Sequence, residues 1–168
     1  MLRFSALVRV MIDSFGEKLS PGKDFVGIGV GGAIICHGQI LLLLRRKPPE
    51  RDHWTMPGGA VEFGETVTDA LFRELKEEIG VETQVIAPLG MTDQILHLEG
   101  THWVSLRFLV DILSGEPKNV CPESHAEMRW FPLDALPENI TLTTREAIAA
   151  YTTWATRGVN SFFRRVAS

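Results

Sequence analysis

The pattern of apolar and polar positions divides this chain of 168 residues into strand-like and helix-like stretches. The stretch VGIGVGGAIICHGQILLLLRR, from Val26 onward, is rich in β-branched and aliphatic residues and is interrupted by His37-Gly38. This pattern is typical of two strands joined by a tight turn. Further strands are predicted over residues 84–98, 102–113 and 127–131.

One helix is predicted over residues 66–79. Thr66 and Asp69 have the spacing of a capping box at its start, and Gly80 supplies a stop signal at its end. The preceding stretch, KPPERDHWTMPGGAVEFGE, is rich in proline and glycine. It is therefore predicted to be a shaped loop rather than a strand or helix.

The remaining elements complete a single domain. A second helix is predicted to begin near Thr143, where Thr143 and Glu146 form another capping box. Alternating strands and helices indicate one mixed α/β domain, placed at residues 25–160. Residues 1–24 are interpreted as an N-terminal extension, an added strand, helix or oligomer contact rather than a cleaved signal, and residues 161–168 as a short tail.

The composition limits the kinds of partner. Seventeen Lys and Arg residues against 21 Asp and Glu residues give a net charge of -4, without a broad basic field for duplex nucleic acid. Two cysteines, Cys36 and Cys121, are too few for a disulfide framework and suit a reducing cytosol, although a single bridge between them stays open. We therefore expect a cytoplasmic protein that binds no nucleic-acid polymer and no membrane.

A glycine motif near the start of the domain has two interpretations. Gly27, Gly29 and Gly32 match G-x-G-x-x-G, the spacing of a dinucleotide-binding turn. That fingerprint must open a helix, whereas here it leads into a second predicted strand. The glycines are therefore expected to let a strand approach its neighbours closely.

The first helix carries an unusual acidic stripe. At roughly 100° per residue, Glu74 and Glu78 fall at the edge of the apolar face formed by Leu71, Leu75 and Ile79. Like charges at i and i+4 repel each other, and partial burial raises the cost of each charge. A divalent cation removes both penalties, and oxygen ligands without His or Cys indicate Mg²⁺ or Mn²⁺ rather than zinc. An ordinary acidic helix with one ion pair is the alternative.

Neighbouring residues favour the metal site. Gly58-Gly59 allows the backbone to turn a carbonyl towards a metal, and Glu65 adds an oxygen ligand just before the helix. Arg73 precedes Glu77 by four residues and can hold that carboxylate in one orientation.

The whole segment GAVEFGETVTDALFRELKEEIGV, residues 59–81, matches a longer motif. It resembles the signature G-x5-E-x7-R-E-U-x-E-E-x-G-U of the Nudix hydrolase family, in which U is aliphatic, and every fixed position matches. The resemblance implies an α/β/α sandwich with a central mixed sheet. It also implies hydrolysis of a nucleoside diphosphate linked to another moiety, with Mg²⁺ as cofactor and Mn²⁺ as a substitute.

The resemblance also implies roles for individual residues. The general base has two candidates. One is Glu77 in the signature, and the other is Glu127, since the family often places a further acid before the strand predicted over residues 127–131. Within the signature, the implied roles are main metal ligand for Glu74 and Glu78, ligand or base for Glu77, carbonyl donor for Gly59 and support for Glu65. Arg73 is counted with the catalytic residues because its spacing from Glu77 lets it orient that carboxylate.

Substrate contacts are predicted outside the signature. Arg45 and Arg46 are the local cations that an acidic protein needs for a phosphate, and Arg46 is expected to meet it. A solubility cluster on an edge strand is the alternative for both. Stacking on a base, with packing in the core as the alternative, is predicted for Trp54 and Phe108, and considered for His102 and Trp103.

Two further stretches, WTMPGGAVEFGE and GEPKNVCPE, resemble a Nudix subgroup of nucleoside triphosphate diphosphatases, except that Cys121 stands at a position where that subgroup has Glu. The expected reaction converts a (deoxy)nucleoside triphosphate or modified nucleotide to the monophosphate and pyrophosphate. The alternatives are a pyrophosphatase of ADP-ribose or another nucleotide sugar, and a non-catalytic nucleotide-binding module, which would lose signature glutamates. The family resemblance also allows a homodimer.

Overall fold

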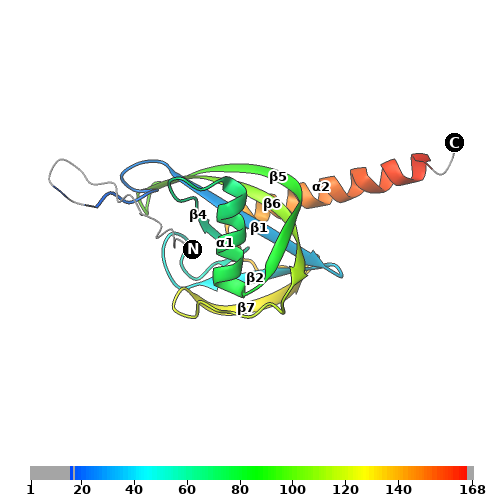
Figure 1. Cartoon of the computed structure of the whole chain (residues 1–168), viewed down its shortest axis with the longest axis horizontal. Coiled ribbons are helices and arrows are strands. Elements are labelled where there is room, and N and C mark those ends of the chain that lie inside the picture. The colour runs from blue at the N-terminus through cyan, green and yellow to red at the C-terminus, as the bar shows by residue number, and fades with distance from the viewer. Residues whose placement is uncertain (1–15, 17, 166–168) are drawn as a thin grey trace, which may run out of the picture.

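The computed structural model describes residue 16 and residues 18–165 (Figure 1). Both predicted helices and all the predicted strands are present. The elements are β1 (Gly27–Cys36), β2 (Gln39–Arg45), β3 (Trp54–Thr55), β4 (Gly58–Ala60), α1 (Val67–Ile79), β5 (Glu82–Leu96), β6 (Thr101–Ser114), β7 (His125–Pro132) and α2 (Leu142–Arg165).

Strand β1 joins the two halves of a mixed sheet. The strand order is β3-β2-β1-β6-β5, with β4 also paired to β1 and β7 to β2. Residues 27–34 of β1 run parallel to β6, whereas Ile35 and Cys36 pair with β2 in the antiparallel hairpin predicted from His37-Gly38. The other pairings are antiparallel, so the sheet is mixed.

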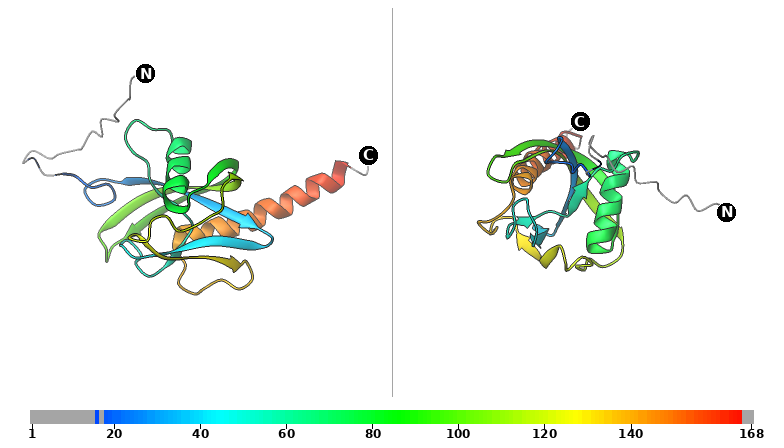
Figure 2. Two further views of the ribbon diagram at one scale, coloured as in Figure 1. Left: turned by 60° about the horizontal axis from the view of Figure 1, so that its bottom comes forward. Right: turned by 90° about the vertical axis from the view of Figure 1, so that its left-hand side faces the viewer.

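Alternate residues of β2 face two separate cores. Leu41 and Leu43 belong to the cluster around α1, and Ile40 and Leu42 to the cluster around α2. All four side chains are fully buried, and burial of each contributes about 2 kcal/mol. Figure 2 shows α1 and α2 on opposite sides of the strands, so the α/β/α sandwich is confirmed.

Helix α1 begins and ends as predicted. The Thr66 hydroxyl accepts a hydrogen bond from the Asp69 amide at 3.1 Å, and Gly80 takes the left-handed conformation with φ 72°. The loop after β6 completes the C-terminal end, because the amides of Lys118 and Val120 donate to carbonyls of the last helical turn. These bonds satisfy acceptors that a helix end otherwise leaves free.

Helix α2 differs from the prediction at both ends. It begins at Leu142, and the residue that caps it is Thr141, whose hydroxyl accepts from the Thr144 amide at 3.4 Å. The capping box at Thr143 was therefore wrong, because the side chain of Glu146 turns to other partners in the sheet. The helix also continues to Arg165, past the start of the predicted tail at residue 161.

The predicted shaped loop contains two short strands, β3 and β4, which periodicity did not indicate.

The glycine motif of β1 opens no helix, and its residues allow close packing as expected. A Cβ at Gly27 would lie 2.4 Å from the indole of Trp103, and one at Gly32 would lie 3.1 Å from a methyl of Leu75. The dinucleotide interpretation is thus excluded by the order of the elements.

The prediction for residues 1–24 falls mainly outside the described part of the chain. The last residues of this segment form a turn at the start of β6, where the His102 amide donates to the Gly22 carbonyl at 2.8 Å.

Cys36 and Cys121 are free thiols. Among the described residues, no helix has the length and apolar run needed to span a membrane.

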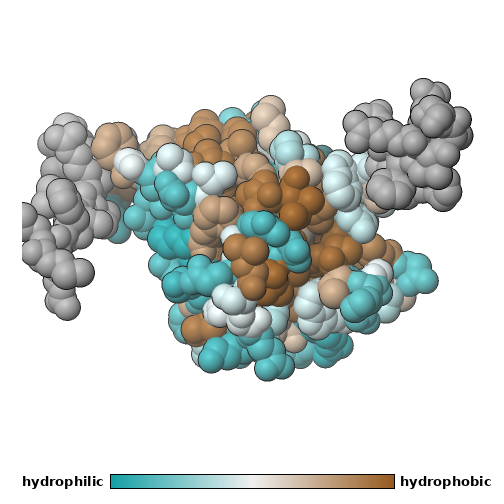
Figure 3. All heavy atoms as spheres, turned by 45° about the vertical axis from the view of Figure 1, so that its right-hand side comes forward, coloured by the Kyte–Doolittle hydropathy of each residue, from teal (hydrophilic) through white to brown (hydrophobic). Residues whose placement is uncertain are grey.

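Apolar residues reach the surface over the middle of the face seen in Figure 3, with polar residues around them. The last strand of the sheet order, β5, exposes Ile86, Met91 and Ile95. The homodimer remains a prediction.

Candidate active site

Helix α1 presents its glutamates to three different environments. The side chain of Glu78 is 11% exposed and that of Glu74 is 15% exposed, whereas Glu77 is 58% exposed. The acidic stripe therefore runs from the buried edge of the helix to solvent, as the helical wheel predicted. Since two of these carboxylates are largely removed from water, their charges need partners in the protein or a bound cation.

Arg73 connects the helix with the loop before it. Its guanidinium donates to both carboxylate oxygens of Glu65 at 2.7 and 3.2 Å, to Glu74 at 2.7 Å and to the Ala60 carbonyl at 3.0 Å. The predicted pair with Glu77 is present but longer, at 3.5 Å. Arg73 is thus a positioning residue, which fixes Glu65 and Glu74 more tightly than the exposed Glu77.

Strand β4 lies directly against the two buried carboxylates. The Gly58 amide donates to Oε2 of Glu78 at 2.8 Å. A Cβ at Gly59 would lie 2.4 Å from the carboxylate of Glu74, and a Cβ at Gly58 would lie 2.1 Å from the Val30 carbonyl oxygen. Glycine at position 59 leaves room for the Glu74 carboxylate, and glycine at position 58 lets β4 approach β1, which explains the pair in the sequence.

The burial of these acids changes their protonation. Desolvation raises the pKa of Glu78 to about 8, against the Gly58 hydrogen bond, and the nearby Glu74 charge raises it further. Desolvation also raises the pKa of Glu74, although Arg73 opposes the shift. The pKa of Glu65 is lowered instead, because Arg73 hydrogen-bonds to its carboxylate. Two buried acids that resist ionisation together favour a cation between them.

The donor set fits a hard divalent cation. Its candidate ligands are all oxygens, which Mg²⁺ and Mn²⁺ prefer. Within the described residues, no three His, Cys, Asp or Glu side chains already form a metal cluster. The residues that would hold the ion therefore remain a prediction: Glu74 and Glu78, with Glu77, Glu65 and the Gly59 carbonyl.

His125 and Arg45 lie near Glu78, on the other half of the sheet. His125 is the register partner of Arg45, and its Nε2 lies 3.6 Å from Oε1 of Glu78. Burial lowers the pKa of His125 to about 4, and the Arg45 charge lowers it further, so this imidazole is neutral at pH 7. No local pattern indicated His125, because the pairing of β2 with β7 joins residues 80 positions apart.

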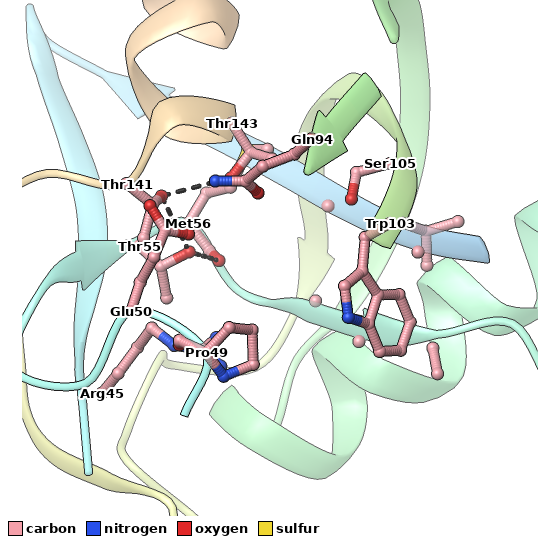
Figure 4. Close-up of a pocket in the computed structure, with 16 residues that line it drawn as sticks. Arg45, Pro49, Glu50, Thr55, Met56, Gln94, Trp103, Ser105, Thr141 and Thr143 are labelled. Carbon is pink, nitrogen blue, oxygen red and sulfur yellow. Dashed lines mark hydrogen bonds between the residues drawn. The ribbon is translucent and has the colours of Figure 1, made fainter. Parts of the chain in front are cut away.

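A cavity of about 150 Å³ opens beside β4 (Figure 4). In the close-up, the Trp103 indole lies on one side of the hollow and Thr55 and Thr141 on the other. The polar residues that line it are Arg45, Glu50, Thr55, Gln94, Ser105, Thr141 and Thr143.

Glycines of β1 leave space for this cavity. Gly29 and Gly31 lie on its wall, and a Cβ at Gly31 would come within 2.7 Å of the Met56 methyl carbon. The polar positions of β5 and β6, such as Gln94 and Ser105, were missed in the sequence. The sequence contained no clear signal for them, because both strands also carry other inward-facing polar residues, such as Thr92 and Arg107.

The structure separates the predicted substrate contacts. Arg45 lines the cavity and donates to the Pro49 carbonyl at 2.7 Å, whereas Arg46 is exposed and donates to the Pro122 carbonyl at 2.9 Å. The expectation that Arg46, rather than Arg45, meets the phosphate is therefore not supported by their positions.

The aromatic candidates separate in the same way. Trp54 is buried edge-on against Phe131 in the core around α2, and Phe108 packs on the core around α1, so neither lines the cavity. Trp103 does. For Trp54 and Phe108 the structural alternative is the better interpretation.

Glu127, the second base candidate, is exposed and forms an ion pair with Arg129 at 2.7 Å. It alternates along β7 with Met128 and Trp130, whose side chains pack on the core around α1. Of the two base candidates, Glu77 is the one on the glutamate cluster.

Comparisons with known proteins agree with this geometry. A family model described as NUDIX domain matches residues 27–151. The ADP-ribose pyrophosphatase of Methanocaldococcus jannaschii is 33% identical over 127 residues, which are 76% of this chain and 73% of that protein. A Mycobacterium tuberculosis H37Rv protein with the provisional name 8-oxo-dGTP diphosphatase 2 is 38% identical over 120 residues, 64% of this chain and 82% of that protein.

A solved structure of similar fold is the MutT NUDIX hydrolase of Burkholderia pseudomallei. It has a TM-score of 0.71 and 40% sequence identity, covering 74% of this chain and 96% of that one.

Proposed function

The chain belongs to the Nudix hydrolase family and is a pyrophosphohydrolase that acts on phosphoric anhydrides, and we propose that its substrate is a nucleoside triphosphate or a modified nucleotide. The proposed products are the nucleoside monophosphate and pyrophosphate. The observation that carries this proposal is a shared strand: β4 contacts the buried Glu74 and Glu78 and also lines the cavity beside Trp103. A base in the cavity would place its phosphates towards the glutamates.

The chemistry follows from the charges on a phosphoric anhydride. Its oxygens repel a nucleophile, so bound Mg²⁺ would neutralise them and lower the pKa of a coordinated water. Glu74 and Glu78 would hold the ion, and Arg73 keeps Glu74 in place. Arg45, at the cavity, is suited to a phosphate oxygen, and the exposed Glu77 is suited to accept the proton of the attacking water.

The second candidate function is hydrolysis of ADP-ribose or another nucleotide sugar. It is favoured by the Methanocaldococcus jannaschii relative, whose name states ADP-ribose pyrophosphatase. The same metal site would serve this reaction, so the two candidates differ in the group attached to the diphosphate and in the products. ADP-ribose would yield AMP and ribose phosphate, without pyrophosphate.

Product analysis on a substrate panel distinguishes the two. The purified chain is incubated with Mg²⁺ and, separately, with NTPs, dNTPs, oxidised purine nucleotides, ADP-ribose and nucleotide sugars. Chromatography then separates pyrophosphate from phosphate and identifies the nucleotide product. We expect the highest kcat/KM for a triphosphate, with pyrophosphate released. A higher kcat/KM for ADP-ribose would contradict the proposal and establish the second candidate.

A further inference from the structure

An ion pair between a buried arginine and a half-exposed glutamate joins α2 to the sheet. Nη1 of Arg107, on β6, lies 3.1 Å from Oε2 of Glu146, on α2. The same carboxylate oxygen accepts a hydrogen bond from the Thr92 hydroxyl of β5 at 2.6 Å, and Nη2 of Arg107 donates to the Met91 carbonyl at 2.7 Å. We call Thr92, Arg107 and Glu146 the three-element network, since each residue comes from a different element.

The surroundings of Arg107 are adapted to this side chain. Arg107 is 6% exposed, and a Cβ at Gly90 would lie 3.2 Å from its Nη2. Gly90 has φ +97°, and the pairing of β5 with β6 shifts register between Pro88 and Gly90. Strand β5 therefore bends at a residue without a side chain, directly over the guanidinium.

Stability alone does not account for a buried charge at this place. Removing Arg107 from water costs free energy, and its pairing with Glu146 returns only part of it. Neither Nε nor Nη1 of Arg107 has a hydrogen-bond partner among the described residues, so the contact with Glu146 is an ion pair without hydrogen-bond geometry, and the solvation of Arg107 is not fully replaced. What the network does supply is a polar connection from α2 to β5 and β6, which are already hydrogen-bonded to each other in the sheet.

Each member of the network stands next to a residue of the cavity wall. Thr92 is two residues before Gln94 on the same face of β5, and Arg107 is two residues after Ser105 on the same face of β6. Glu146 follows Thr143 by three residues, about one turn of α2. Displacement of any of the three elements would move one wall of the cavity relative to the others.

We propose that Thr92, Arg107 and Glu146 are positioning residues that fix the width of the cavity and so determine which nucleobase it accepts. This inference rests on the proposed function, because it takes the cavity to be the base site. The network acts on Gln94, Ser105 and Thr143 through the backbone and does not touch the glutamates of α1. It should therefore affect substrate binding and base selectivity without affecting the hydrolytic step.

The test compares KM and kcat in Thr92→Val, Glu146→Gln and Arg107→Met. Each is measured with the triphosphate that the wild-type chain hydrolyses best and with one that differs only in its base. Lys76→Met and Glu82→Gln are matched controls, since they break an exposed ion pair between α1 and β5. Affinity for the four common nucleoside monophosphates, measured by calorimetry, repeats the comparison without turnover.

We expect the network variants to raise KM for the preferred base about tenfold, with kcat within about twofold of wild type, and to lower base selectivity by a similar factor. The controls should leave both unchanged. Thr92→Val removes one hydrogen bond at nearly constant volume, so it decides the question if Arg107→Met does not fold. A folded Thr92→Val with wild-type KM, monophosphate affinity and selectivity would overturn the proposal, as would a fall in kcat at constant KM.

Failure of the proposed function gives a different result. In that case the wild-type chain releases no pyrophosphate from any triphosphate, while the calorimetric comparison of the same variants still tests the network. Reduced and less selective monophosphate affinity in the network variants supports the positioning role. Unchanged affinity contradicts it.

Discussion

At the scale of single residues, Glu78 shows how burial changes the protonation of an acid. Its carboxylate has the Gly58 amide on one oxygen and His125 near the other. Both partners are uncharged at pH 7, since the pKa of the imidazole is lowered to about 4. Desolvation dominates and raises the pKa of Glu78 to about 8, although the Gly58 hydrogen bond and the charge of Arg45 favour the ionised form.

This shift predicts how stability depends on pH without a divalent cation. The pKa of Glu78 in the folded protein lies above its ordinary value of 4.5. The stabilisation that the protonated Glu78 contributes to the free energy of unfolding is therefore complete below pH 4.5 and is lost as the pH rises through about 8. Between those limits, the free energy of unfolding should fall in wild type relative to Glu78→Gln, by at most about 5 kcal/mol.

Urea unfolding in EDTA at several pH values measures this difference. Glu82→Gln is the control, because Glu82 is exposed on β5. A constant difference between wild type and Glu78→Gln across the range would show that Glu78 is already ionised in the folded protein.

At the scale of elements, the features that depend on local sequence were predicted well, whereas the features that depend on contacts between distant residues were not. The limits of α1 follow from Thr66, Asp69 and Gly80, which act within one helix. The position of Glu74 and Glu78 at the edge of the apolar face of α1 was predicted for the same reason, because it is set by helical periodicity. Strand β4 and the cavity depend on pairing with β1, β5 and β6, so no local pattern indicated them.

The start of α2 gives a testable case of this difference. Thr141 and Thr143 both precede suitable helical sequence, but Thr141 is 1% exposed and hydrogen-bonds to Thr144 at 2.8 Å and to Thr55 at 3.3 Å. Thr141→Ala should lower the free energy of unfolding by about 1–2 kcal/mol, because it removes the helix cap and buried hydrogen bonds. Thr143→Ala should cost less than about 0.5 kcal/mol. Chemical denaturation measures both, and an equal cost would contradict the assignment of the cap.

At the scale of the whole molecule, part of the acidic charge behind the net charge of -4 is concentrated at one site. Glu65, Glu74 and Glu77 surround Arg73, Glu78 lies on the same helix, and Arg45 lies at the neighbouring cavity. A chain without a broad basic field can therefore bind the phosphates of one nucleotide at a local site. The sandwich brings this about by placing α1 and the cavity on the two faces of the short strand β4, beside the central β1.

The central claim is that the buried glutamates of α1 hold the cation needed for hydrolysis. Steady-state turnover of the best triphosphate in Glu78→Gln, as a function of Mg²⁺ concentration, tests it most directly, with Glu82→Gln as a Glu-to-Gln control on the surface. We predict that Glu78→Gln folds and loses at least about a hundredfold in kcat/KM, whereas Glu82→Gln keeps wild-type turnover. Wild-type kcat/KM and Mg²⁺ dependence in a folded Glu78→Gln would contradict the account.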